Sequence, residues 1–334
     1  MKKITIETVA KRAGVSTAAV SYALSGKRKI SPEVLEKIMK AVDDLEYRPS
    51  IIARNLASRK TWTVGLYTSP TLNIREDVFF NSLLAGILDN LHDKKYQLHL
   101  YADYLSVNAE DFPDLSMTQP IDGALIMNPR INDVYLDYLV KQGIPFIVIG
   151  TPAKPEKMFY VDVDLTAAAY TAATYLISKG HSNILYINGP SDYMQSIHHI
   201  QGIMMALKEN GVELKSGAVF HIPMVEEEAY NLLKSVGAGL KAYSAILAFH
   251  DVFSFGVMRY LKENNFQIPH DIAYISLGNS LFCRVFSPAI TSVDLAPYDM
   301  GYKAVEMLID VIEKRRFQPS HTIIPAALVE RESV

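Results

Sequence analysis

The chain has 334 residues, 49% of them hydrophobic, and a formal net charge of −3. This length allows more than one domain, and a single cysteine, Cys283, excludes a framework of internal disulfides. No apolar stretch approaches membrane-spanning length, and Met1–Thr5 runs into a charged amphipathic segment without a signal-peptide core, so we expect a cytoplasmic protein with no membrane contact.

The first expected elements are two short helices around a tight turn, within Thr5–Gly26. Apolar residues recur at helical spacing on both sides of Gly14, and Ser16 is placed to cap the second helix. Ser31-Pro32, a helix N-cap residue followed by proline at the first helical position, predicts a third helix. Together they predict a helix-turn-helix module, whose second helix enters the major groove of DNA by its N-terminal end.

Charge separates this module from the rest of the chain. Residues 1–60 hold 13 Lys and Arg against 6 Asp and Glu, a net charge of +7, whereas the remainder has a net charge of −10. A basic head supplies the attraction to phosphates that dominates non-specific DNA binding. The alternative interpretation is a solvated helical face that happens to be rich in lysine.

After Lys60, short apolar runs alternate with segments of helical length. The expected strands are Thr63–Tyr67, Leu98–Tyr101, Gly123–Met127, Phe146–Ile149, Asn183–Asn188, Ala245–Phe249 and Ala273–Leu277. The expected helices are Phe80–His92, Ala167–Lys179, Ile197–Asn210, Glu226–Gly239, Val252–Asn264 and Tyr298–Arg315. Such alternation predicts parallel sheets covered on both faces, here an α/β body of two doubly wound lobes with a ligand cleft at the carboxyl ends of the strands.

The expected domain organisation is therefore an all-α head followed by an α/β body. Residues 1–48 would form the DNA-binding domain, residues 49–61 a hinge, and residues 62–334 the two-lobed body. The lobe change is expected near residues 160–166, and a return crossing near residues 291–297.

Signatures of enzymes and metal sites are missing from the sequence. It has no phosphate-binding GxxxxGK[ST] loop, no GxSxG nucleophile elbow, and no CxxC or HExxH spacing. His198 and His199 are adjacent, so on a helix they point apart and form a poor chelating pair. We expect no catalytic residue, no cofactor and no metal. A sugar-processing enzyme remains a less favoured alternative.

Several segments carry a resemblance to a known family. They are Thr5–Gly26, Leu45–Gly65, Ser178–His181, Ser287–Thr291, Met300-Gly301 and Val329–Ser333. In order and spacing they resemble the lactose-repressor (LacI/GalR) family of bacterial transcription regulators, over essentially the whole chain. The resemblance implies a periplasmic-binding-protein-like body and a homodimer that represses transcription from a pseudo-palindromic operator.

The resemblance also implies which residues contact DNA. Thr17, Ala18 and Tyr22 would read bases from the recognition helix, and Ser16, Ser21 and Arg28 would contact phosphates or flanking positions. In the hinge helix, Ala53 and Asn55 would lie at the operator, and Leu56 would wedge into the central base step. An amphipathic linker with a core leucine is the alternative interpretation of the hinge.

The effector cleft is where the sequence departs from the family pattern. His199 stands in place of an arginine, His250 precedes Asp251 where the family has an Asn-Asp pair, and Gly150 and Gly278 replace frequent aspartates. The best polar anchors are His199, His250, Asp251 and Asn279. Of five aromatic candidates, about half should line a ligand site. They are Tyr67, Phe79, Phe80, Tyr193 and Phe282.

The resemblance implies a small carbohydrate or related metabolite as the effector, and these residues favour an oligosaccharide over a simple hexose. Aromatic faces stack on sugar rings, and the two histidines would make binding pH-dependent at about pH 6–7. The alternative interpretation is that both histidines only form hydrogen bonds with backbone groups at the ends of strands. For the regulator as a whole, control by a protein partner is the alternative to control by a sugar.

Overall fold

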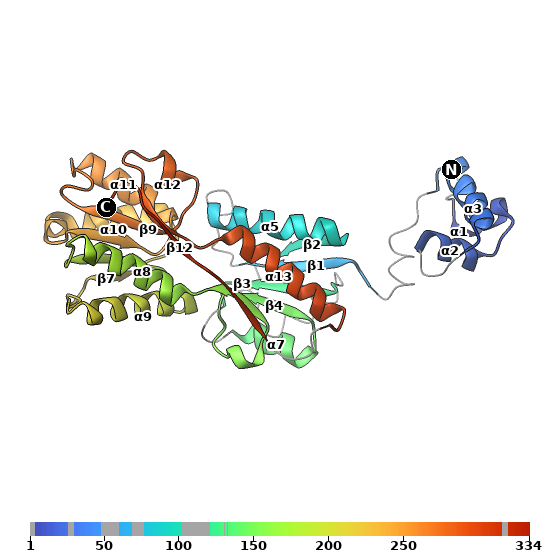
Figure 1. Cartoon of the computed structure of the whole chain (residues 1–334), viewed down its shortest axis with the longest axis horizontal. Helices are drawn as coiled ribbons and strands as arrows, with labels where there is room; N and C mark the ends of the chain where they lie inside the picture. The colour runs from blue at the N-terminus through green and yellow to red at the C-terminus, as the bar shows by residue number, and fades with distance from the viewer. Residues whose placement is uncertain are drawn as a thin grey trace. The chain divides into compact units, whose positions relative to one another are not determined.

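The structure, a computed structural model, describes residues 4–25, 30–47, 60–68, 77–101, 121–129, 131, 133–315 and 320–334. The chain divides into two compact units, Met1–Thr61 and Trp62–Val334. Figure 1 follows both units along the chain, from blue to red.

The first unit contains three helices, α1 (Ile6–Ala13), α2 (Thr17–Ser25) and α3 (Pro32–Asp44). Its core is formed by apolar side chains from all three helices, with Val9, Val20 and Ile38 fully buried. A capping box of Thr5 and Thr8 starts α1, and Gly14 ends it in the left-handed conformation at φ 67°. The expected helix-turn-helix is therefore present.

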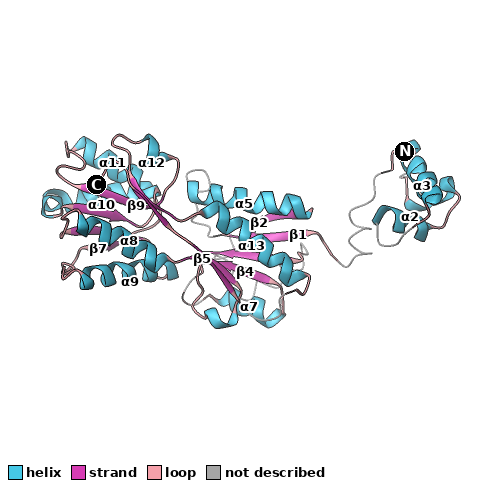
Figure 2. Ribbon diagram, in the orientation of Figure 1, coloured by secondary structure: helices cyan, strands magenta, loops and turns pink. Residues whose placement is uncertain are grey.

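The second unit contains two lobes, each built on a six-stranded sheet (Figure 2). In the first lobe the strand order is β11-β5-β4-β3-β1-β2, and all neighbours are parallel. Its strands are β1 (Thr63–Tyr67), β2 (Gln97–Tyr101), β3 (Gly123–Met127), β4 (Phe146–Ile149), β5 (Tyr160–Val163) and β11 (His321–Ile324). Its helices are α5 (Val78–Lys94), α7 (Val134–Gln142) and α13 (Pro297–Ile312), and a 3-10 turn covers Pro155–Lys157. Helices α5 and α13 lie on one face of the sheet, and α7 on the other.

In the second lobe the strand order is β12-β10-β9-β8-β6-β7, with β12 antiparallel to β10 and the other pairs parallel. Its strands are β6 (Ile184–Asn188), β7 (Val219–His221), β8 (Ala245–Ala248), β9 (Ala273–Gly278), β10 (Thr291–Asp294) and β12 (Ala327–Val329). Its helices are α8 (Leu165–Ser178), α9 (Met194–Glu209), α10 (Glu226–Val236), α11 (Val252–Glu263) and α12 (Phe282–Val285), with a 3-10 turn at Gly237–Ala242. The two doubly wound lobes confirm the expected fold class.

The chain passes between the lobes three times. The first passage runs from β5 into α8 and the second from β10 into α13, within the two ranges expected from the sequence. The third, from β11 into β12, was not expected. Both strands of this passage are short, with partly exposed side chains, so no continuous apolar run marks them.

Glycines allow the helices of each lobe to pack in close pairs. An added Cβ at Gly202 of α9 would overlap the carbonyl oxygen of Thr166 at the start of α8. The same holds for Gly256 of α11 against Glu226 of α10, and for Gly301 of α13 against Leu83 of α5. Backbone contact without intervening side chains thus sets the positions of the helices that cover the sheets.

The final residues tie the second lobe together. The Ser333 hydroxyl donates to the carbonyl of Tyr274 and accepts from the Thr291 amide at 2.8 Å. The Arg331 guanidinium donates to the Ile290 carbonyl and to the Asn279 side chain, both at 2.6 Å. The segment Val329–Ser333 therefore acts as a clasp across β9 and β10.

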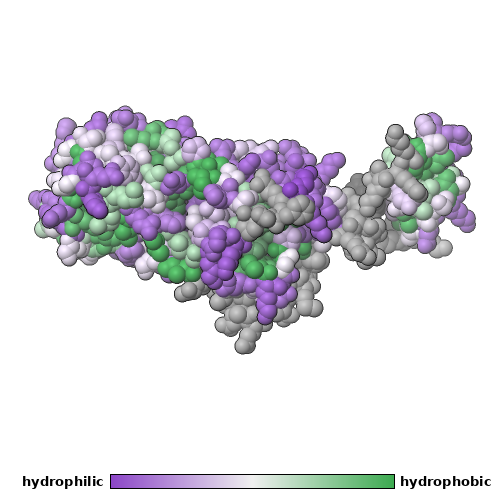
Figure 3. Space-filling view, turned by 60° about the horizontal axis from the view of Figure 1, so that its bottom comes forward, coloured by the Kyte–Doolittle hydropathy of each residue, from purple (hydrophilic) through white to green (hydrophobic). Residues whose placement is uncertain are grey.

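The surface of the second unit is mixed in character. Hydrophilic and hydrophobic residues lie interspersed on the face shown in Figure 3. No helix in the described part of the chain is long and apolar enough to cross a membrane. Within the same residues, no group of three or more His, Cys, Asp or Glu side chains is arranged to hold a metal ion.

Candidate functional site

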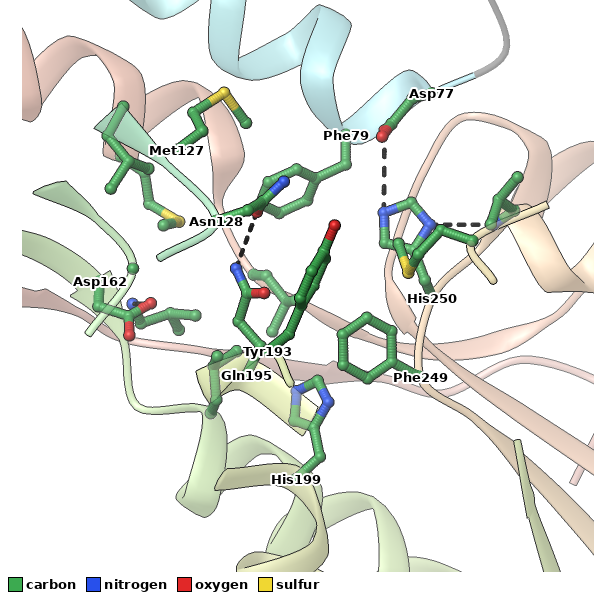
Figure 4. Close-up of a pocket in the computed structure, with 18 residues that line it drawn as sticks. Asp77, Phe79, Met127, Asn128, Asp162, Tyr193, Gln195, His199, Phe249 and His250 are labelled. Atoms are coloured by element: carbon green, nitrogen blue, oxygen red, sulfur yellow. Dashed lines mark hydrogen bonds and ion pairs between the residues drawn. The ribbon is translucent and has the colours of Figure 1, made fainter. Parts of the chain in front are cut away.

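A cleft opens between the two lobes, at the carboxyl ends of their parallel strands (Figure 4). It contains about 970 Å³ of space, part of it open to solvent. Most of its lining is apolar and includes Phe79, Tyr193 and Phe249. Its polar lining residues are Asp77, Asn128, Asp162, Gln195, His199 and His250. This position is where ligands bind in doubly wound folds.

Four of the nine side chains expected in the effector site line this cleft. Phe79 lies near the start of α5, and Tyr193 directly precedes α9 and stands in the middle of the cleft. His199 lies one and a half turns into α9, and His250 follows β8. Figure 4 shows all four around one space.

The other three aromatic candidates do not line the cleft: Tyr67 and Phe80 lie in hydrophobic cores, and Phe282 is half-buried. Tyr67 stacks on Tyr101 with ring centroids 4.4 Å apart, and burial raises its pKa to about 12. Phe80 is fully buried beneath α5. Phe282 packs edge-on against Phe255 at 4.8 Å. Phe80 directly follows the cleft-lining Phe79 on α5, and a step of one residue on a helix turns the side chain from the cleft into the core.

Two polar candidates also lie outside the cleft. The buried Asp251 carboxylate accepts hydrogen bonds from the Ser276 hydroxyl and the Ser280 amide. The Asn279 side chain donates to Asp294 at 2.9 Å and accepts from Arg331. Both therefore hold the loops of the second lobe together, and the expectation that they anchor a ligand is corrected.

His250 bridges the two lobes. Its Nδ1 accepts a hydrogen bond from the Val252 amide at 3.2 Å, so the ring proton resides on Nε2. Nε2 lies 3.8 Å from Asp77 Oδ1, across the cleft. Asp77 also caps α5 by accepting from the Phe80 amide at 2.9 Å. His250 thus satisfies a strand-end backbone group, as one interpretation of the sequence proposed, and also contacts the opposite lobe.

His199 is buried at the floor of the cleft, and neither of its ring nitrogens has a hydrogen-bond partner among the described residues. Its ring meets Phe249 edge-on, with centroids 4.5 Å apart. Burial, with minor repulsion from His198 and His250, lowers its pKa to about 3. The ring is therefore neutral at physiological pH, which corrects the expectation that it titrates at about pH 6–7.

Asp162 is a lining residue that sequence reasoning missed. Its carboxylate accepts from both the amide and the hydroxyl of Thr151, each at 2.7 Å, and from the Val163 amide at 2.8 Å. Burial outweighs these hydrogen bonds and raises its pKa to about 6. The signal was the alternation Val161-Asp162-Val163 at the end of β5, which places Asp162 on the opposite face of the sheet from its two valine neighbours.

The neighbouring strand explains why the carboxylate comes from residue 162. Ile149 pairs with Val161, so Gly150 and Asp162 are the next residues on the two adjacent strands. Gly150 has φ 105°, a conformation that side-chain-bearing residues rarely adopt, and a Cβ there would lie 3.1 Å from Pro129. Gly150 thus leaves this edge of the cleft without a side chain of its own, and the Asp162 carboxylate lies on the strand beside it.

Further hydrogen bonds join the lobes on the other side of the cleft. Gln195 of α9 donates to the side chain of Asn128, which follows β3, at 2.9 Å. The Ile131 amide donates to the Asp192 carbonyl at 3.3 Å. Together with the contact between Asp77 and His250, these bonds hold the lobes against each other on both sides of the cleft.

The head presents its expected recognition residues on the surface. Thr17, Ala18 and Tyr22 are exposed on α2, with Tyr22 at 37%. The Ser16 hydroxyl accepts from the Ala19 amide at 3.2 Å and so caps α2, while Ser21 is half-buried. DNA contacts are also expected for four residues that lie outside the described part of the chain, namely Arg28, Ala53, Asn55 and Leu56.

Two family models match parts of the chain. Residues 5–50 match bacterial regulatory proteins of the lacI family, and residues 173–334 match a periplasmic binding protein-like domain. The HTH-type transcriptional regulator RegA of Clostridium saccharobutylicum is 25% identical over 332 residues, which cover 98% of each chain.

Two solved structures resemble the whole chain. A complex of the transcriptional regulator CelR with cellobiose has 25% identity and a TM-score of 0.76, covering 99% of this chain and 100% of that one. The lac repressor dimer bound to operator and the anti-inducer ONPF has a TM-score of 0.86 over 99% of each chain. Its identity of 18% makes this second likeness one of fold alone.

Proposed function

The chain belongs to the LacI family of bacterial regulatory proteins, and on that premise we propose that it is a transcriptional repressor controlled by a small effector. It would bind a pseudo-palindromic operator as a homodimer, in the cytoplasm, where the bacterial chromosome lies. The observation that carries the proposal is the joining of a helix-turn-helix head to a two-lobed body with a lined cleft.

The head supports the DNA-binding part of the proposal. Its net charge of +7 over residues 1–60 attracts the phosphate backbone, and α2 exposes Thr17, Ala18 and Tyr22 on one surface. Two heads in a symmetric dimer would read two half-sites, with Leu56 of each hinge at the operator centre.

The cleft supports an effector of carbohydrate type. Aromatic rings from both lobes, Phe79 and Tyr193 among them, provide faces for sugar rings, and Asn128, Gln195 and His199 provide hydrogen-bonding groups. One solved structure that resembles the whole chain is a complex of the transcriptional regulator CelR with cellobiose. An oligosaccharide would use these aromatic faces along its chain of rings.

A ligand in the cleft would act through the contacts that join the lobes. It would displace or reinforce the bonds from Asn128 to Gln195 and from Asp77 to His250, and so change the angle between the lobes. The connections to the heads leave from the first lobe, so a lobe movement would alter the spacing of the two hinges.

The described residues also support a regulatory role over an enzymatic one. Cys283 is buried, and burial together with Asp251 raises its pKa to about 12, so it is a poor nucleophile. Asp251 itself is engaged by Ser276 and the Ser280 amide.

The proposal is tested by selecting binding sites for the full chain from random DNA. We expect a pseudo-palindromic site that the protein binds as a dimer, at least about a thousandfold tighter than random DNA of equal length. Cellobiose or a related oligosaccharide should change that affinity. A protein that stays monomeric on the selected DNA, or binds it no tighter than random DNA, would contradict the proposal.

A further inference from the structure

The charged groups around the cleft are unusually one-sided. The lining contains two carboxylates and two imidazoles, from Asp77, Asp162, His199 and His250. None of the described lining residues is Lys or Arg. His250 Nδ1 accepts a backbone hydrogen bond, which leaves that ring with a single proton, facing Asp77. The described lining therefore offers a ligand negative charge and neutral groups.

His199 adds a requirement for the ligand. Both of its nitrogens are buried without a partner, and Ser196, one turn earlier on α9, has a buried hydroxyl in the same condition. A neutral imidazole has one N–H to donate and one lone pair to accept, and each costs free energy when left unpaired away from water. A ligand hydroxyl can satisfy either nitrogen. An ionised carboxylate or a phosphate dianion has no proton for the lone pair.

Asp162 also disfavours a negatively charged ligand. Its carboxylate is held in place by Thr151 and Val163 and is buried in the wall of the cleft. A second negative charge nearby would be repelled in these poorly solvated surroundings, with no described cation to offset it. A hydroxyl or an amine could instead donate to the carboxylate.

We propose that the cleft selects an uncharged, hydroxylated ring compound and rejects its phosphorylated or carboxylated counterpart, with His199 and Asp162 making the selection. The aromatic side chains Phe79, Tyr193 and Phe249 pack against the ring, and His199 exchanges hydrogen bonds with a hydroxyl. This inference rests on the proposed function, in which the cleft is the effector site.

The test compares neutral sugars with their phosphates on the full chain. Cellobiose, maltose and trehalose, each paired with its 6-phosphate, are titrated calorimetrically. We expect at least one neutral sugar to bind, and its phosphate to bind at least about tenfold more weakly, a difference of about 1.4 kcal/mol.

Two substitutions each make the cleft more positive by one charge. His199→Arg and Asp162→Asn should each reduce the discrimination against the phosphate by at least about tenfold. His198→Arg adds the same charge to the adjacent position of α9, outside the cleft lining, and should leave the discrimination unchanged. His199→Gln keeps a neutral donor and acceptor and should preserve the discrimination, so it covers the case in which a buried arginine prevents folding.

The outcomes separate this inference from the proposed function. Equal or tighter binding of a phosphate by the unmodified chain would overturn the inference, as would equal effects of His198→Arg and His199→Arg, or no binding of any neutral sugar. Operator binding is measured on the same preparation. If it is intact in these cases, the DNA-binding regulator stands, whereas its loss would reject the proposed function itself.

Discussion

At the scale of single residues, burial decides what the two cleft histidines can do. Both are polar groups in a largely apolar cavity, yet His250 has a backbone donor and a carboxylate beside it, whereas His199 has neither. An unsatisfied buried imidazole is retained only if something offsets its cost, and a bound ligand or water would do so.

The free energy of unfolding should decrease as the pH is lowered, and part of this decrease should depend on His199. Its pKa is about 3 when folded and 6.5 ordinarily, so below pH 6.5 the unfolded chain takes up a proton that the folded chain refuses. Stability from this group is thus lost as pH falls, by up to about 1.4 kcal/mol per pH unit.

Urea unfolding of the unmodified chain and of His199→Gln, at several pH values between about 4 and 7, checks this prediction. The stability of the variant relative to the unmodified chain should increase as the pH falls. Asp162, whose raised pKa gives the opposite slope, is common to both proteins and cancels. A stability difference that stays constant with pH would show that His199 titrates normally.

Base preference should depend on Tyr22. Its ring is exposed on the recognition helix and offers one hydroxyl, whereas arginine can grip a guanine edge with two hydrogen bonds. Tyr22→Arg should therefore change the preferred base at one symmetric pair of operator positions, as measured by site selection from random DNA. Recovery of the same site by both proteins would mean that Tyr22 does not read bases.

The residues of the cleft were only partly predictable from the sequence. His199 and His250 could be located because they interrupt a recognised motif. Asp162 was missed because its place in the cleft depends on β5 lying beside β4, a pairing that no motif in the sequence indicates. Asp251 was misplaced because a strand-end carboxylate can turn either toward the cleft or back onto its own loops.

At the scale of elements, glycines set how closely the helices pack. Gly202 lets α9 approach the backbone of α8 at Thr166, and Gly256 and Gly301 play the same part in the other two helix pairs. Because the obstacle in each case is a carbonyl group and not a flexible side chain, the helix axes themselves would have to move apart to admit a methyl group.

Gly202→Ala should consequently destabilise the second unit, although alanine is the better helix former. We expect a loss of about 1–3 kcal/mol, against a gain of about 1 kcal/mol from helix propensity. Urea unfolding of the full chain provides the measurement. Gln201→Ala, at the exposed neighbouring position on α9, is the matched control and should change stability little. Equal stabilities for the two variants would show that α8 and α9 separate freely.

Most long elements were predictable, because their apolar periodicity extends over many residues. The expected helix Glu226–Gly239 ends earlier, at Val236, because Gly237 adopts a positive φ of 53° and turns the chain. The strands β7, β11 and β12 have three or four residues with partly exposed side chains, and pairing with a distant strand creates them. Local pattern carries little information about such strands.

At the scale of the whole molecule, an exposed apolar patch marks a candidate subunit contact. Leu281 and Val285, on and beside α12, are 58% and 68% exposed. Large apolar side chains so exposed next to each other favour contact with another protein surface. For a homodimer, the same patch on two copies would provide an isologous interface.

Val285→Asp should accordingly weaken the dimer by at least about tenfold, because a carboxylate would be buried in an apolar contact. Sedimentation equilibrium over a range of concentrations measures the change. Met205→Asp, which places the same charge at a 49% exposed apolar position on α9, is the control and should leave association unchanged. Operator affinity should drop with the dimer. Unaltered association of the Val285 variant would place the interface elsewhere.

The three passages between the lobes also bear on how the protein is synthesised. The first lobe needs α13 and β11 to complete its sheet and cover, and the second needs β12 and the clasp at Arg331 and Ser333. A ribosome must therefore synthesise the chain through α13 and β11 before the first lobe can finish folding, and through β12 and Ser333 before the second can. The head depends on none of these late segments and can fold first. A nascent chain would thus expose a folded DNA-binding module attached to an unfinished body, and the time spent in that state calls for chaperone protection of the apolar strands.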